Sequence, residues 1–154
     1  SKDLQYRTIL QFPTASLPDN AVITQALLTI QLETTVGTNP FTTHGNIWID
    51  IRKGAFGSFG PFAIGALQTS DFQAPASLYT AGVMLNNPVG GWYWTSLDAK
   101  AFSFVNPTGV TQLRLGFQVD DDDDMKDDYL SFFSGNYNVV SARPQLTIKY
   151  YIPK

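Results

Sequence analysis

The stretch Gln112-Leu113-Arg114-Leu115-Gly116-Phe117-Gln118-Val119 decides the fold, because its apolar and polar residues alternate without a break. Successive side chains of a β-strand point to opposite faces of the sheet, so a period of two predicts a strand. We expect the apolar row to face a protein core and the polar row to face solvent. The stretch is therefore predicted to be a half-buried strand.

The same alternation marks further strands on both sides of this stretch. The clearest lie at residues 26–32, 47–52 and 146–152, and shorter candidates lie at residues 7–12, 92–97 and 129–133. Turn-forming runs such as Leu17-Pro18-Asp19-Asn20 and Asn106-Pro107-Thr108-Gly109 separate them. The region 54–87 is mixed in character, and a short helix is expected there only at residues 69–72.

The number of strands and the lack of helical patterns predict the fold class. About seven or eight strands, each with one apolar face, can bury those faces only against a second sheet. The sequence therefore predicts an all-β protein with an antiparallel β-sandwich. No Gly/Ser linker, shift in composition or internal repeat divides the chain, so we expect a single module over residues 1–154.

Composition and charge exclude several classes of protein. With 154 residues, 44% of them hydrophobic and 15% charged, the chain is too apolar to be disordered. It has no run of about 18 apolar residues, so membrane insertion is not expected. A net charge of -3 argues against nucleic acid as a partner. Cys is absent, and a single His and a single Glu form no recognisable catalytic arrangement, so we expect no enzyme.

The negative charge is concentrated in one acidic run. Seven of the 13 acidic residues lie within residues 120–128. Alternating carboxylates in a flexible loop suit Ca²⁺, which binds about six to eight oxygens, and a structural calcium ion is the cofactor that we expect. The candidate metal ligands are Asp120, Asp122, Asp124, Asp127 and Asp128. The alternative is a solvated acidic turn whose carboxylates pair with Arg114, Lys126 or Arg143.

The candidate ligand-binding residues are four aromatic side chains: Trp48, Trp92, Tyr93 and Trp94. An exposed aromatic ring offers a flat platform on which a sugar ring stacks. Trp92 and Trp94 point to one face of a strand and Tyr93 to the other, so only one of these two sets belongs to the core. Trp48 lies between inward residues of a predicted strand, which makes it the best exposed candidate. The alternative is that these rings are packed in the structure.

Both ends of the chain carry motifs that occur together in one family. Near the start stand Tyr6-Arg7-Thr8-Ile9-Leu10-Gln11-Phe12 and Ser16-Leu17-Pro18-Asp19-Asn20-Ala21-Val22-Ile23-Thr24. Near the end stand the acidic run, Asp128-Tyr129-Leu130-Ser131-Phe132-Phe133-Ser134-Gly135-Asn136, and Arg143-Pro144-Gln145-Leu146-Thr147-Ile148-Lys149-Tyr150. In this combination the chain resembles the DNRLRE-type modules of secreted bacterial and archaeal proteins.

The resemblance implies a jelly-roll-like β-sandwich that is non-catalytic and extracellular, on secreted or cell-surface proteins of bacteria or archaea. Such modules are grouped with carbohydrate-binding modules, so it implies a polysaccharide or cell-surface glycan as the partner, or attachment of the parent protein to a surface. Members normally carry a further strand before the segment that matches residues 6–12, and we expect this chain to lack it. The alternative is a structural or assembly domain of a surface stalk or filament, completed by a strand from a partner segment.

Overall fold

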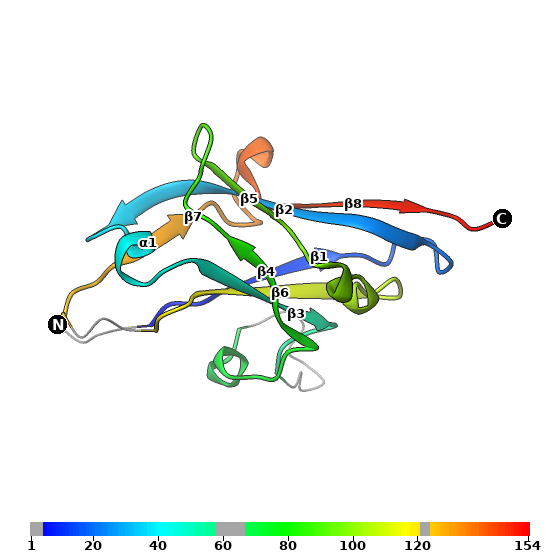
Figure 1. Cartoon of the computed structure of the whole chain (residues 1–154), viewed down its shortest axis with the longest axis horizontal. Helices are drawn as coiled ribbons and strands as arrows, with labels where there is room; N and C mark the ends of the chain where they lie inside the picture. Colours follow the sequence, from blue (N-terminus) through cyan, green and yellow to red (C-terminus); the bar gives the residue numbers. More distant parts are fainter. Residues whose placement is uncertain (1–4, 58–66, 121–123) are drawn as a thin grey trace.

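The computed structural model describes residues 5–57, 67–120 and 124–154 and is an antiparallel β-sandwich (Figure 1). Its strands are β1 (Thr8–Pro13), β2 (Val22–Val36), β3 (Ile47–Lys53), β4 (Leu78–Met84), β5 (Trp92–Ser96), β6 (Val110–Phe117), β7 (Tyr129–Phe132) and β8 (Gln145–Tyr151). The short helices between them are α1 (Pro40–Thr43) and the 3-10 helices η1 (Thr69–Phe72), η2 (Ala99–Phe104) and η3 (Val140–Ala142). The predicted all-β sandwich is confirmed. None of the helices in the described residues is long and apolar enough to cross a membrane.

Two sheets pack face to face. One has the strand order β1-β6-β3-β4. The other has β2 at its centre, with β5 on one edge and both β7 and β8 on the opposite edge. In Figure 1, β2 and β8 run along one layer, and β1, β3 and β6 run along the other. The backbone N–H of Asp98 donates to the carbonyl of Ala81 (2.7 Å) where β5 meets β4, so β1 and β8 are edge strands on the other side of the sandwich.

The core lies between the sheets and consists of the inward rows that the alternation predicted. Its members include Ala26, Leu28, Ile30, Ile47, Ile49, Ile51, Leu113 and Leu115. The four clearest predicted strands correspond to β2, β3, β6 and β8, and the three shorter candidates to β1, β5 and β7. β4 was not predicted, because its sequence LYTAGVM lacks a clear period of two.

The prediction for the polar face of the 112–119 stretch holds for the exposed Gln118 but is wrong for Gln112 and Arg114, where β6 is covered on both sides. Gln112 and Arg114 were expected in solvent, yet both are buried. The backbone N–H of Phe56 donates to Gln112 Oε1 (2.8 Å), and the Phe56 ring lies over the Arg114 guanidinium, 4.4 Å from its carbon. Phe56, which follows β3, therefore covers the outer face of this sheet at Gln112 and Arg114.

The short helix predicted at residues 69–72 is present as η1, and Arg114 holds it against the sheet. Within the helix, Asp71 Oδ2 accepts a hydrogen bond from the backbone N–H of Gln68 (2.9 Å). Arg114 donates from its NH1 nitrogen to the backbone carbonyls of Asp71 (3.1 Å) and Ala74 (2.6 Å). These bonds fix η1 beside the outer face of the sheet.

Candidate functional site

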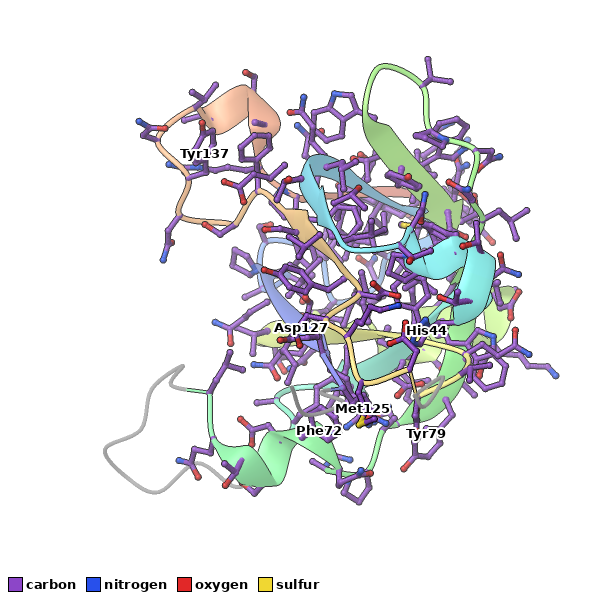
Figure 2. All side chains as sticks on the ribbon, turned by 90° about the vertical axis from the view of Figure 1, so that its left-hand side faces the viewer. His44, Phe72, Tyr79, Met125, Asp127 and Tyr137 are labelled. Atoms are coloured by element: carbon purple, nitrogen blue, oxygen red, sulfur yellow. The ribbon has the colours of Figure 1, made fainter. Side chains whose placement is uncertain are left out.

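A groove of about 380 Å³ lies on the outer face of the β1-β6-β3-β4 sheet, beside the segment that carries η1. Aromatic, charged and amide side chains line it, among them Arg7, Trp48, Asp50, Gln73, Tyr79, Gln118 and Asp120. Figure 2 views the sandwich from one end and shows Phe72 of η1 and Tyr79 of β4 on the same side of the molecule. A hollow of this size is typical of sites that bind small ligands.

Trp48 provides an indole ring to the groove. It lies opposite Gly116 of β6 and Val83 of β4 on the outer face of β3, and 40% of it is exposed. Gly116 has no side chain, and the stem of Arg7 lies on that flank, with its Cγ 3.4 Å from where a Cβ at Gly116 would be. Tyr79 is also exposed on the neighbouring strand. The outward orientation predicted for Trp48 is therefore correct.

Asp50 of β3 links the strands on either side of it, β6 and β4. Its Oδ2 accepts from Arg114 NH2 (2.8 Å) and Nε (3.2 Å), and its Oδ1 accepts from the backbone N–H of Thr80 (3.1 Å). Thr80 has a φ of 51°, a left-handed conformation that is strained for a β-branched residue, at a register shift between β3 and β4. The carboxylate thus holds this strained position of β4, next to Tyr79, in place.

Arg7 closes the groove on the side of η1. Its NH1 donates to the carbonyl of Phe72 (2.6 Å), and its guanidinium carbon lies 4.3 Å from the centre of the Phe72 ring. Its NH2 is 3.9 Å from Asp120 Oδ1, and the Asp120 side chain is 67% exposed. Arg7 is therefore fixed by η1 and only loosely paired with Asp120.

The structure does not bring the four predicted aromatic residues together. Tyr93 is buried in the core, with its ring stacked on Phe41 at a centroid distance of 5.4 Å, and burial raises the pKa of its hydroxyl. It is therefore not available to a ligand at the surface. Trp92 and Trp94 lie on the outer face of the other sheet, with Trp92 half-buried and Trp94 exposed. Trp48 alone belongs to the groove.

Sequence reasoning did not select Asp50, Gln73 or Tyr79 as groove residues. For Asp50 a signal was present, since Asp50 and Arg114 carry opposite charges at outward positions of two predicted strands. For Gln73 and Tyr79 there was none, because both lie in the mixed region 54–87. Their position in the groove depends on how that region folds over the sheet.

The described carboxylates of the acidic run point in different directions. Asp120 faces Arg7, as described above. Asp124 pairs with Lys126 (3.2 Å), as the alternative of a solvated turn predicted, and a hydrogen bond from the backbone N–H of Lys126 lowers the pKa of Asp124. Asp128 Oδ1 accepts from the backbone N–H of Thr38 (2.7 Å), while its buried Oδ2 has no hydrogen-bond partner among the described residues.

The other predicted partners of the acidic run lie elsewhere. Arg114 pairs with Asp50, and Arg143 donates from its Nε to the carbonyl of Tyr137 (2.7 Å). Desolvation raises the pKa of the Tyr6 hydroxyl, and the negative charge of Asp127 adds to this effect. Asp122 lies outside the described residues, and the part of the chain that the structure describes contains no group of three His, Asp or Glu side chains placed to hold a metal.

Gly37→Ala is expected to destabilise the protein more than its matched control, Gly90→Ala. Both glycines have positive φ (69° and 59°), so alanine brings left-handed strain of about 1–2 kcal/mol at either position. A Cβ at Gly37 would also overlap Asp128 Oδ1 and the backbone oxygen of Asp127, whereas nothing lies within 4 Å of a Cβ at Gly90. We expect urea unfolding to show a further loss of about 1 kcal/mol or more for Gly37→Ala. Equal stabilities would contradict the packing of residues 127–128 on this turn.

Comparison with protein-family models, with curated proteins and with solved structures gave no match. The resemblance to DNRLRE-type modules therefore stays a prediction.

Proposed function

We propose that this domain is a non-catalytic extracellular module that binds glycans in the groove beside Trp48 and so attaches its parent protein to a polysaccharide or cell surface. The observation that carries the proposal is the exposed Trp48 indole next to carboxylate, guanidinium and amide side chains. A sugar ring presents C–H groups that pack on an aromatic face, and hydroxyl groups that bond planar polar side chains. The groove offers surfaces for both.

The state of Asp50 supports binding rather than catalysis. A hydrolytic site of the usual kind needs two carboxyl groups free to act on the substrate, one of them as a proton donor. Both oxygens of Asp50 already accept hydrogen bonds from Arg114 and Thr80. This carboxylate is therefore part of the framework of the groove.

Trp48→Ala is expected to weaken glycan binding at least about tenfold, because truncation of a central Trp removes the main apolar contact. Trp94→Ala is the matched control, since Trp94 is exposed to a similar extent (36%) on the outer face of the other sheet. A glycan array with the wild-type chain identifies the ligand, and calorimetric titration then compares the two variants. A blank array, or equal loss of affinity in both variants, would contradict the proposed site.

A structural calcium ion at the acidic run stays a prediction. A bound ion at a hundredfold excess over its dissociation constant would add about 2.7 kcal/mol to the free energy of unfolding. We therefore expect the thermal midpoint to rise with Ca²⁺ and to fall with chelator, with little change for Mg²⁺. A midpoint that is the same with Ca²⁺ and with chelator would contradict the ion.

A second candidate function is assembly, in which a strand from another segment completes the sandwich. The supporting observation is that no further strand among the described residues pairs with the outer edges of β1 and β8. Leu10 of β1 and Leu146 of β8 lie opposite the fully buried Leu113 and Leu28, yet both are only half-buried. Since these side chains face the core, an added strand at this edge would cover them.

Sedimentation velocity over a range of concentrations tests the assembly candidate. Self-association through this edge should disappear in Leu146→Lys, which places a charge on the inward row, and should persist in Thr147→Lys on the outward row. A chain that stays monomeric at all concentrations would contradict self-assembly.

A further inference from the structure

We infer that Asp120 determines which glycans the groove accepts: its charge, opposite Arg7, favours neutral sugars and excludes acidic ones. The inference rests on the proposed function, because it concerns the ligand class of the same groove. It depends on which of the charged side chains around the groove are available to a ligand.

Arg114 is not available to an acidic ligand. Its side chain is only 3% exposed, and its Nε and NH2 both bond Asp50 Oδ2. Its NH1 donates to the backbone carbonyls of η1 and of Ala74. Its positive charge is therefore compensated inside the protein by Asp50, and its N–H groups are directed at protein acceptors.

Arg7 is the accessible cation of the described groove lining. The Phe72 carbonyl and ring fix its guanidinium and leave NH2 on the side of Asp120. A guanidinium held in this way is suited to the carboxylate of a uronic acid, which binds its planar N–H groups in pairs. Arg7 alone would therefore favour an acidic glycan.

Asp120 reverses this preference. At 3.9 Å the Asp120 carboxylate is too far from Arg7 NH2 for a hydrogen bond. Its negative charge nevertheless neutralises the guanidinium and repels the carboxylate of an acidic sugar that approaches Arg7. A neutral sugar meets no such repulsion, because one hydroxyl can donate to Asp120 while another accepts from Arg7. The two pairs, Arg114 with Asp50 and Arg7 with Asp120, leave these four groove side chains without net charge.

The test compares binding of neutral polymers (glucan, mannan, xylan) and uronic acid polymers (polygalacturonate, alginate) at low and high NaCl. We expect the wild-type chain to bind a neutral polymer with an affinity that NaCl changes less than about twofold, and to bind the acidic polymers weakly or not at all. Asp120→Asn should raise affinity for an acidic polymer at least about fivefold at low NaCl, and NaCl should abolish this gain. Asp98→Asn, an exposed position next to β5 and outside this groove lining, should change neither affinity.

Adding Arg7→Gln to Asp120→Asn identifies the receptor of the acidic group. If Arg7 binds the uronate, the gain disappears in the double variant, while the thermal midpoint shows that the fold is intact. Preference of the wild-type chain for acidic polymers, or no gain in Asp120→Asn, would overturn the inference but leave glycan binding in place. Binding of no glycan by the wild-type chain or by Asp120→Asn would overturn the inference together with the proposed function.

Discussion

Asp50→Ala is expected to lower the free energy of unfolding by about 3–5 kcal/mol, the cost of leaving a buried charge without its partner. Arg114 cannot reach solvent, since only 3% of its side chain is exposed, and Asp50 is the carboxylate that compensates it. The backbone carbonyls around Arg114 NH1 orient the guanidinium but carry no net charge. The strained Thr80 also loses the acceptor of its N–H. Urea unfolding followed by tryptophan fluorescence measures the effect.

Two further variants separate the buried charge from other causes. Asp19→Ala removes an exposed carboxylate in a turn and should change the stability by no more than about 0.5 kcal/mol. Adding Arg114→Met to Asp50→Ala should recover part of the loss, because the double variant no longer buries an uncompensated cation. Asp50→Ala within about 1 kcal/mol of the wild type would contradict the role given to this ion pair.

Phe56→Ala is expected to cost about 3–5 kcal/mol, as truncation of a fully buried aromatic ring does in a core. Phe56 lies in a connecting segment, outside the strands, but its ring is buried against Arg114. Its removal uncovers the Arg114 guanidinium, whereas the hydrogen bond from the backbone N–H of residue 56 to Gln112 is retained. The measurement is again the free energy of unfolding in urea.

Phe72→Ala is the matched control for this prediction. Phe72 makes the same kind of contact with Arg7, at nearly the same distance, but both partners are only partly buried. We expect it to cost less than half as much as Phe56→Ala, because solvent already reaches this pair. Equal losses of unfolding free energy in the two variants would show that Phe56 is no more tightly packed on β6 than Phe72 is on Arg7.

The strand predictions succeeded where apolar and polar residues alternate clearly and failed where they do not. The row Ile47, Ile49 and Ile51 of β3 could be assigned to the core from alternation alone, because aliphatic residues occupy every second position of the strand. β4 has no such contrast, and a register shift and the left-handed Thr80 interrupt its pairing with β3. The polar row of β6 reads as exposed, since nothing in residues 112–119 reveals that Phe56 and η1 will cover it.

The aromatic residues show the same limit at the candidate site. Alternation separated Trp92 and Trp94 from Tyr93, but it assigned neither set to the core. The packing of Tyr93 against Phe41 and Phe132 decides that question, and both partners come from distant parts of the chain. Alternation did assign Trp48 to the outward row, because its neighbours Ile47 and Ile49 are unambiguous.

The sequence by itself determined the β-sandwich and the inward rows of its clearest strands, because side-chain direction along a strand is a local property with a fixed period. Only the tertiary structure decided the groove, which gathers Arg7, Trp48, Tyr79 and Asp120 from four separate segments. It also decided the pairing of Asp50 with Arg114, which requires the register between β3 and β6. Such contacts depend on the relative placement of whole strands and loops, and no local pattern encodes that placement.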